Sequence, residues 1–293
     1  MRPRVTLQLP GRPLPATRPL SGARVLLVGE GYVARALRPG LERAGARVDA
    51  TARDGEWALA GPRARAAFAA ASHVLVSVPP GRAAGPDPAL RALGGAETRA
   101  DWIGYLSATS VYGDRAGGWA FEGEAPTPGL ARGVRRADAE AAWLERFSAT
   151  HLFRLAGIYG PGRSPFAALR DGTARVVEAP GHVVNRIHVE DIARALLLSM
   201  ARPCPGEILN IADGRPAPPW EVTDFAAHLL GLPPPPRVPL MDRSVSDMAR
   251  SFYRETKRIA VGRAASRLGW TPLYPSYRAG LEAVLAADQG MVT

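Results

Sequence analysis

The chain has 293 residues and a mass of 31.1 kDa, which is long enough for one large α/β domain or for two smaller lobes. An apolar fraction of 46% and a charged fraction of 22% exclude a wholly disordered chain, and no stretch of about 18 apolar residues is present to span a membrane. The formal net charge is +10, from 37 basic and 27 acidic residues, and Lys257 is the only lysine. This charge is compatible with nucleic acid binding or with an arginine-rich composition.

The cysteine and histidine content argues against a metal site. Cys204 is the only cysteine, which excludes an intramolecular disulfide and a cysteine-based metal site. The five histidines show no metal-ligand spacing. Residues 1–22 are basic and proline-rich without the apolar core of a signal peptide, so we expect a flexible tail and a cytoplasmic protein.

The first half of the sequence alternates short apolar strands with helices. We predict strands at 24–28, 47–51, 73–78, 102–107 and 151–155, and helices at 32–44, 62–71, 88–93 and 128–147. The last of these helices carries Pro128 at its first position and Thr127 as its predicted N-cap. Strands that alternate with helices over this many units predict a parallel sheet covered on both faces.

The second half is less regular. Strand-like segments recur at 186–189 and 207–211, and helices are predicted at 221–230, 244–254, 263–268 and 276–287. We therefore predict an α/β fold, a Rossmann-type doubly wound parallel sheet with a smaller C-terminal substrate lobe made of discontinuous segments. The predicted division is a cofactor lobe at 23–160 that 183–213 complete, and a small lobe at 161–182 and 214–293.

A glycine-rich turn follows the first predicted strand. It has the pattern G-x-G-x-x-A, formed by Gly29, Gly31, Tyr32, Val33 and Ala34. The glycines let the backbone approach a pyrophosphate at a helix N-terminus, and the small third residue lets the helix pack on the strand. Because the turn lies between a strand and a helix in the first βαβ unit, we predict a dinucleotide site there.

The end of the second strand discriminates between NAD and NADP(H). Asp49 stands about 20 residues after the turn, where an acid would bind the ribose of NAD. However, Asp49 lies inside the predicted strand, and the strand ends at Thr51, Ala52 and Arg53. A small residue followed by arginine leaves room and a cation for a 2′-phosphate, so we expect NADP(H), with NAD as the alternative.

The sequence resembles the extended short-chain dehydrogenase/reductase superfamily, the NAD(P)-dependent sugar epimerase/dehydratase group. The resemblance runs from residue 24 to about 285, and the order and spacing of its motifs make it specific. The matching motifs are YLS at 105–107, VYGD at 111–114, FRLAGIYGPGR at 153–163, NRIHVEDIA at 185–193, LNIAD at 209–213, LGW at 268–270 and YPSY at 274–277.

The resemblance implies a Rossmann-type cofactor lobe with a second lobe closing over a substrate. It also implies contact between the nicotinamide end of the cofactor and Gly157, Ile158 and Tyr159. For the segment around 188–191 we expect structural roles, with Asp191 capping the next helix and His188 packing beneath it.

The usual catalytic residues of the family are missing. Members use a Ser/Thr, a Tyr and a Lys four residues after the Tyr, and the register set by Glu140 places these at Ala108, Arg132 and Arg136. A guanidinium stays protonated and cannot act as a general base at neutral pH. The resemblance therefore points to an atypical member, in which Ser107, Thr109 or Tyr112 would supply the acid/base group.

The two arginines have two interpretations. Arg132 and Arg136 lie one turn apart on the long helix and could hold an anionic group of substrate or cofactor, Arg136 being a candidate cofactor ligand. Alternatively, Arg136 pairs with Glu140 and Arg132 faces water. The Y-x-x-x-K match at Tyr253 and Lys257 lies far past the cofactor lobe, and we interpret it as fortuitous.

These observations predict an atypical NADP(H)-binding oxidoreductase or epimerase/dehydratase-like enzyme with a small-molecule substrate, for which an anionic group is one hypothesis. The alternative is a non-catalytic NADP(H) sensor or scaffold. We expect no membrane partner and no specific nucleic acid, because the long helix mixes Arg135 and Arg136 with acidic residues. The family resemblance also makes a homodimer an expectation.

Overall fold

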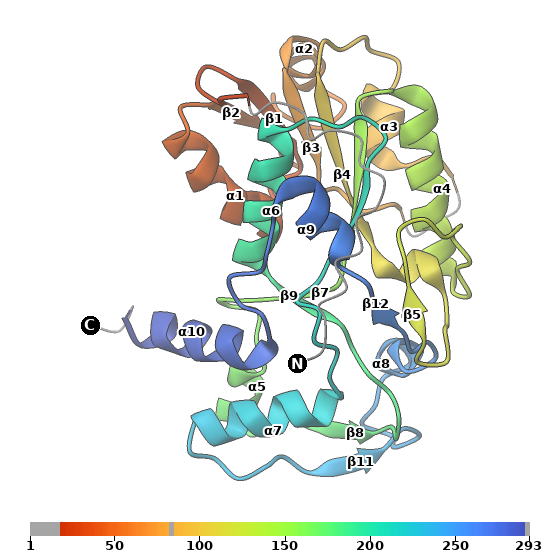
Figure 1. Cartoon of the computed structure of the whole chain (residues 1–293), viewed down its shortest axis with the longest axis vertical. Coiled ribbons are helices and arrows are strands. Elements are labelled where there is room, and N and C mark those ends of the chain that lie inside the picture. The colour runs from red at the N-terminus through yellow and green to blue at the C-terminus, as the bar shows by residue number, and fades with distance from the viewer. Residues whose placement is uncertain (1–17, 82–84, 291–293) are drawn as a thin grey trace, which may run out of the picture.

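A six-stranded parallel sheet forms the centre of the computed structural model, which describes residues 18–81 and 85–290 (Figure 1). The strand order is β10-β6-β4-β3-β1-β2, and every neighbouring pair is parallel. This sheet confirms the predicted Rossmann-type fold class. Its strands are β1 (Arg24–Val28), β2 (Arg47–Ala50), β3 (His73–Val76), β4 (Trp102–Ala108), β6 (Thr150–Leu155) and β10 (Ile208–Ile211).

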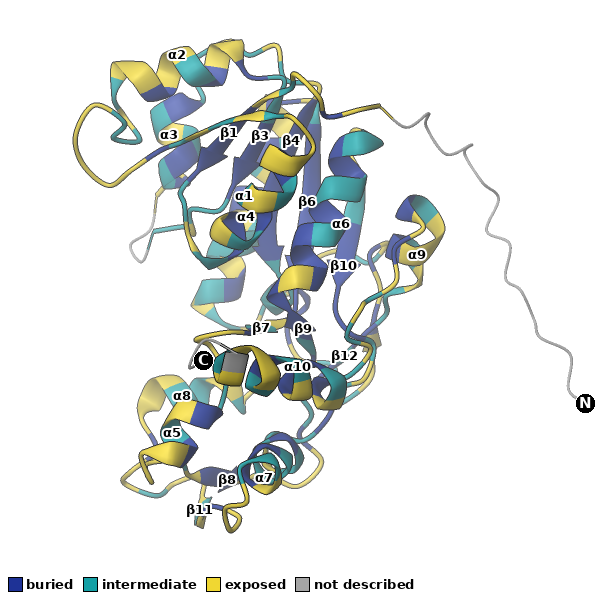
Figure 2. Cartoon of the chain, turned by 90° about the vertical axis from the view of Figure 1, so that its left-hand side faces the viewer, coloured by how far each residue is buried: buried dark blue, intermediate teal, exposed yellow. Residues whose placement is uncertain are grey.

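Helices cover both faces of the sheet, because successive strand residues point to opposite faces. In β1, Val25 and Leu27 join one core cluster and Leu26 and Val28 the other. The first cluster lies under α1 (Tyr32–Arg43), α6 (Val189–Ala201) and α9 (Gly262–Leu268), and the second under α2 (Pro62–Ala70), α3 (Pro88–Leu93) and α4 (Ala131–Arg146). The sheet is accordingly buried between the helices (Figure 2).

A smaller lobe lies beyond the carboxyl ends of the strands and has its own core cluster around Phe166, Ala226 and Leu281. Its elements come from separate parts of the chain. They are α5 (Phe166–Arg170), β8 (Val176–Glu178), α7 (Pro219–Leu229), β11 (Arg237–Pro239) and α10 (Tyr277–Gly290), with β8 and β11 paired.

Short elements connect the two lobes. The strand β7 (Gly157–Tyr159) pairs with β9 (Arg186–His188), and β5 (Trp119–Ala120) pairs with β12 (Arg258–Ile259). A 3-10 turn, η1 (Thr109–Tyr112), follows β4, and α8 (Asp247–Phe252) precedes β12. These elements were not predicted, except that α8 falls inside the helix expected at 244–254 and β9 inside the strand expected at 186–189.

Two predicted helix caps are wrong. The helix α4 begins at Ala131 rather than 128, and the Thr127 hydroxyl donates to the Tyr112 carbonyl oxygen instead of capping it. The N-cap of α6 is His188, whose ring nitrogen accepts from the Glu190 amide. Asp191 lies inside the first turn and accepts from two amides of the segment after α9, those of Leu273 and Tyr274. Thr127 and Asp191 therefore make tertiary hydrogen bonds instead of the helix-capping bonds that the local sequence pattern predicted.

Two boundaries of the predicted division also change. The segment 258–270 belongs to the larger core, because Ile259, Leu268 and Trp270 are buried in the first cluster. In the predicted tail, Leu20 is buried in the same cluster and the Arg18 amide donates to Ala201, while 1–17 lie outside the described residues. None of the helices in the described ranges is long and apolar enough to cross a membrane.

Candidate functional site

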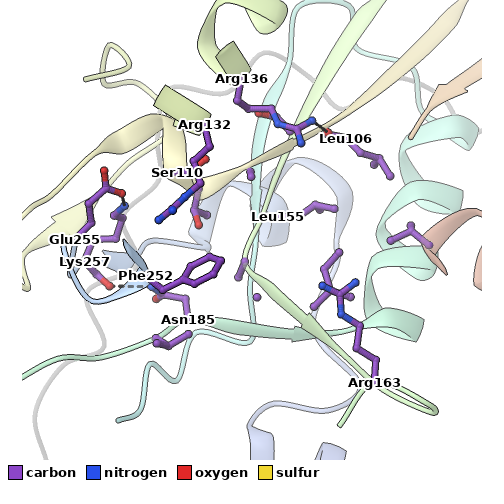
Figure 3. Close-up of a pocket in the computed structure, with 18 of the residues that line it drawn as sticks. Leu106, Ser110, Arg132, Arg136, Leu155, Arg163, Asn185, Phe252, Glu255 and Lys257 are labelled. Atoms are coloured by element: carbon purple, nitrogen blue, oxygen red, sulfur yellow. Dashed lines mark hydrogen bonds and ion pairs between the residues drawn. The ribbon is translucent and has the colours of Figure 1, made fainter. Parts of the chain in front are cut away.

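A cavity of about 780 Å³ opens where the carboxyl ends of β1, β3, β4 and β6 meet the second lobe (Figure 3). This is where open α/β sheets bind ligands. At one end it is lined by the glycine-rich turn and at the other by the segment after α8. The lining comprises Gly31, Tyr32, Val33, Ser77, Leu106, Ser107, Ala108, Thr109, Ser110, Arg132, Arg136, Leu155, Ala156, Gly157, Ile158, Arg163, His182, Val183, Val184, Asn185, Pro219, Ala249, Phe252, Tyr253, Glu255 and Lys257.

The glycine-rich turn leaves a helix N-terminus open toward the cavity. Gly29 has φ +86°, and a Cβ atom there would lie 2.8 Å from Val78 Cγ2, so only glycine fits. At Gly31 the nearest atom to an added Cβ is Ser77 Oγ at 3.9 Å, which leaves space for a ligand. Gly31 is also the N-cap of α1, with no side-chain cap and no acid in the first turn. The first amides of α1 are therefore available to an anion.

A cationic side chain, Arg163, lies near this turn. The Tyr32 hydroxyl donates to the Pro161 carbonyl oxygen at 2.9 Å, which fixes the loop after β7 against α1. The Arg163 guanidinium lies 5.7 Å from the centre of the Tyr32 ring and lines the cavity. The amides of α1 and this guanidinium together favour a polyanionic ligand such as a pyrophosphate.

The two arginines of α4 form another wall, and neither has a carboxylate partner among the described residues. The Arg136 guanidinium donates to the Leu106 carbonyl oxygen at 2.8 Å and to the Tyr105 hydroxyl at 3.3 Å. The Arg132 guanidinium donates to Ser251 and stacks 4.5 Å from the centre of the Phe252 ring. The predicted alternative, an Arg136–Glu140 pair, is wrong because Glu140 pairs with Arg154.

Ser107 lines the cavity, but its hydroxyl proton is already bonded. Its Oγ donates at 2.5 Å to Glu140 Oε1. Arg154 forms a bidentate ion pair with the same carboxylate, with a shortest N–O distance of 2.7 Å. Both charged side chains are at most 4% exposed. Ser107 therefore presents lone pairs to the cavity and can accept a hydrogen bond there, but it is poorly placed to donate a proton.

The other predicted hydroxyl groups divide between the cavity and the core. Thr109 lines the cavity, as does its neighbour Ser110. Tyr112 does not: its hydroxyl donates to Asn210 Oδ1 at 2.7 Å, and Arg154 stacks 4.8 Å from the centre of its ring. Because Tyr112 is fully buried on the core side of η1, its prediction as an acid/base group is wrong.

The predicted cofactor contacts also divide. Gly157 and Ile158 line the cavity, whereas Tyr159 turns into the small lobe and lies against Gly280, where an added Cβ would be 1.9 Å from its hydroxyl. Ala34 is fully buried on the inner face of α1, where it packs the helix on the sheet and does not line the cavity. Arg53 is exposed just after β2 and remains a predicted ligand, and Gly29 shapes the turn without lining the cavity.

Sequence reasoning missed the far end of the cavity. Lys257 and Tyr253, which we interpreted as a fortuitous match, both line it. Lys257 Nζ lies 3.0 Å from Glu255 Oε2, and the two side chains are only 9% and 7% exposed. Their proximity to α4 depends on tertiary contacts that no local pattern encodes, and the one available signal was the rarity of lysine in this chain.

Comparisons with known proteins agree with this geometry. No family model matches the chain. A curated relative from a Streptomyces species, 3-diazoavenalumate denitrifying reductase, is 32% identical over 171 residues, or 54% of this chain, and the chain spans 55% of the length of that relative. A solved structure of a functionally unknown conserved protein from Silicibacter pomeroyi is 42% identical, with a TM-score of 0.81 over 90% of this chain and 99% of that one.

A further solved structure, MoeE5 in complex with UDP-glucose and NAD, shares the fold at 24% identity. Its TM-score is 0.75 over 92% of this chain and 99% of that one. The chain belongs to the same family as the functionally unknown Silicibacter pomeroyi protein, and it shares its fold with MoeE5.

The positions that the sequence resemblance assigns to a catalytic Ser/Thr, Tyr and Lys all line one cavity. Ala108 lies at the end of β4, and Arg132 and Arg136 face it from α4. This wall of the cavity therefore carries two guanidinium groups, which cannot accept a proton at neutral pH.

Proposed function

We propose that this protein binds NADP(H) in the cavity and uses it to reduce or oxidise a small anionic substrate. The observation that carries the proposal is the continuity of the cavity, which runs from the open N-terminus of α1 to the guanidinium groups of Arg132 and Arg136. The first end suits a dinucleotide pyrophosphate, and the second suits a reacting molecule with a negative charge.

The residues present fit a nicotinamide dinucleotide. Gly31 leaves room for backbone contact, the amides of Tyr32 and Val33 and the Arg163 guanidinium would hold the pyrophosphate, and Gly157 and Ile158 would flank the nicotinamide. When bound, this cofactor supplies or accepts a hydride. The NAD complex of MoeE5 supports the same type of cofactor.

The surroundings of β2 support NADP(H) over NAD. Asp49 turns away from the glycine-rich turn and lines a separate hollow of about 210 Å³ with Arg24 and Arg47. The Thr51 hydroxyl accepts from the Gly29 amide at 2.9 Å and is thereby occupied. Arg53 is exposed after the strand and free of any carboxylate partner within the described ranges, as a ligand for a 2′-phosphate requires.

Two unpaired guanidinium groups support an anionic substrate. Arg136 is held by the Leu106 carbonyl and Arg132 by Ser251 and the Phe252 ring, so both are oriented without being neutralised. Planar guanidinium groups bind carboxylate or phosphate through paired N–H donors. Neither arginine can move a proton at neutral pH, so they would bind and orient the substrate.

Binding and turnover test the proposal separately. Titration with NADPH and NADH should show tighter NADPH binding, and Arg53→Ala should reduce this preference about tenfold through loss of one charged contact. In a screen that monitors NADPH oxidation, carbonyl compounds that carry a carboxylate should be reduced faster than carbonyl compounds that lack one. Tight NADPH binding without turnover would favour the sensor alternative, and the absence of binding would refute both.

A further inference from the structure

The ion pair between Glu255 and Lys257 is buried at a cost in folding free energy, and the proposed cofactor contacts do not explain why it is there. Both side chains are more than nine-tenths buried, and Glu255 Oε1 has no hydrogen-bond partner in the described part of the chain. Burying a charged pair costs free energy unless its remaining donors and acceptors are satisfied. An unsatisfied carboxylate oxygen next to an ammonium group in a cavity wall is typical of a functional site.

The backbone on both sides of Lys257 is fixed by hydrogen bonds. The Asn185 side chain donates to the Lys257 carbonyl oxygen at 2.8 Å and accepts from the Ile259 amide at 3.0 Å. Thr256 accepts from Val183 through its hydroxyl, and its amide donates to Asp114 at 2.7 Å. The pair β5–β12 continues this attachment. Lys257 is thus held in place at the cavity, as a reacting group requires.

We propose that Lys257 is the proton donor for carbonyl reduction in this cavity and that Glu255 positions its ammonium group. This inference rests on the proposed oxidoreductase function. Lys257 lines the same cavity as the glycine-rich turn, and Figure 3 shows it near Arg132 and the Phe252 ring, with Arg136 at the top of the same space. Lys257 would donate the proton that the sequence resemblance assigns to a tyrosine at position 132, where this chain has arginine.

The proton and electron balance of the step is complete. The carbonyl carbon gains a hydride from the reduced nicotinamide, the carbonyl π pair moves to oxygen, and that oxygen takes one proton from Lys257 Nζ. The substrate is reduced by two electrons to an alcohol, the nicotinamide is oxidised by two, and the lysine becomes a neutral amine. Water then returns a proton to the amine.

The other cavity groups are less suited to this role. The hydroxyls of Thr109 and Ser110 are neutral and far weaker acids than an ammonium group. Burial raises the pKa of Tyr253 by more than the nearby Arg186 charge lowers it, which makes its phenol a weaker acid. Burial lowers the pKa of His182, which leaves it without a proton to give at neutral pH.

The burial of Lys257 favours proton release. Burial lowers its pKa, Glu255 and Asp114 raise it, and Arg132 lowers it. His182 lies on the same side of the cavity and is neutral when Lys257 is charged. A pKa below the ordinary value for lysine brings the ammonium group nearer to the working range of a general acid.

The first test uses the fact that Lys257 is the only lysine in the sequence. With 13Cε-labelled lysine, the whole chain gives one lysine signal in an NMR titration, which needs neither cofactor nor substrate. We expect this signal to titrate below the ordinary lysine pKa, and Glu255→Gln to move the midpoint about one unit lower by removing the ion pair. An ordinary midpoint that Glu255→Gln does not change would overturn the proposal.

The second test separates proton donation from charge alone. With a carbonyl compound that the wild-type protein reduces, Lys257→Met and Lys257→Arg should both lower kcat about 100-fold or more, because arginine keeps the charge but holds its proton. KM should change less than kcat, and Arg175→Met, an exposed cation far from the cavity wall, is the matched control. Glu255→Gln should move the alkaline limb of the pH profile of kcat to lower pH.

The remaining outcomes decide against the proposal in distinct ways. Activity retained in Lys257→Arg would assign Lys257 to charge recognition, and loss of activity in Tyr253→Phe with retention in Lys257→Met would assign the proton to the phenol. If the wild-type protein reduces no carbonyl compound while NADPH binds, the oxidoreductase function itself fails. The proton-donor role then fails with it, even where the NMR midpoint is low.

Discussion

Glu140→Gln should destabilise the protein strongly, because it removes the charge that neutralises Arg154 in the core. The two side chains are 4% and 2% exposed, and Arg154 donates to both carboxylate oxygens. A glutamine amide of the same size would face the guanidinium with its own donors. Breaking a buried pair while leaving one charge behind costs about 3–5 kcal/mol.

The surroundings of Arg154 suggest a value in the upper half of that range. Its NH1 atom already lacks a hydrogen-bond partner, and its guanidinium lies 4.8 Å from the centre of the neutral Tyr112 ring. In a protein of this size a loss of about 4 kcal/mol lowers Tm by about 10 °C. Urea unfolding monitored by circular dichroism, together with a thermal scan, would measure both quantities.

A double variant gives the control. Replacing both partners by methionine removes the charges together, so Glu140→Met with Arg154→Met should cost less than Glu140→Gln alone. Ser107→Ala leaves the ion pair intact and should cost about 1 kcal/mol. If Glu140→Gln loses less than 1 kcal/mol, or if the double variant equals the sum of its single changes, the assigned coupling is incorrect.

Three further predictions follow from single positions. Gly29→Ala should weaken NADPH binding and cost about 1–2 kcal/mol in urea unfolding, since its φ is +86° and the new Cβ would contact Val78; unchanged binding would contradict this. Burial raises the pKa of Asp213 to about 7. An acid with a raised folded-state pKa stabilises the fold below its unfolded pKa of about 4, and this contribution is lost as the pH rises through about 7, so Asp213→Asn should flatten the decline in stability over that range. An identical pH dependence would show that Asp213 does not titrate there. Gly280→Ala should cost about 1–3 kcal/mol of stability by overpacking, because the new Cβ would overlap the Tyr159 hydroxyl. If Tyr159→Phe does not reduce this loss of stability, the contact with the hydroxyl is not its cause.

The central sheet could be predicted because its signals are local. Each strand is a short apolar run bounded by turn residues, and the alternation of Val25, Leu26, Leu27 and Val28 between two cores explains why such a run is apolar throughout. The glycine-rich turn was equally readable, because Gly29 and Gly31 must satisfy backbone conditions that few other residues meet. Periodicity and backbone conformation are properties of neighbouring residues, so the sequence alone could specify them.

The end of the cavity that contains Lys257 could not be predicted in the same way. The VYGD motif predicted a phenol at the cavity, but η1 directs the Tyr112 ring into the core, where its hydroxyl donates a hydrogen bond to Asn210. Lys257 was interpreted as remote because it lies far past the predicted cofactor lobe in the sequence, yet Asn185 and Thr256 attach its segment to the cavity wall. The positions of Tyr112 and Lys257 both depend on hydrogen bonds to residues that are distant in the sequence, Asn210 and Asn185 respectively.

The burial of Lys257 also determines how this protein responds to amine chemistry. The many surface cations are arginines, and the only lysine side chain is 9% exposed inside a ligand cavity. Acetylating, biotinylating or crosslinking reagents directed at lysine should therefore leave the outer surface of the described fold unmarked. The rate of any slow reaction at Lys257 would report how often the cavity opens to the reagent, and so would measure relative motion of the two lobes.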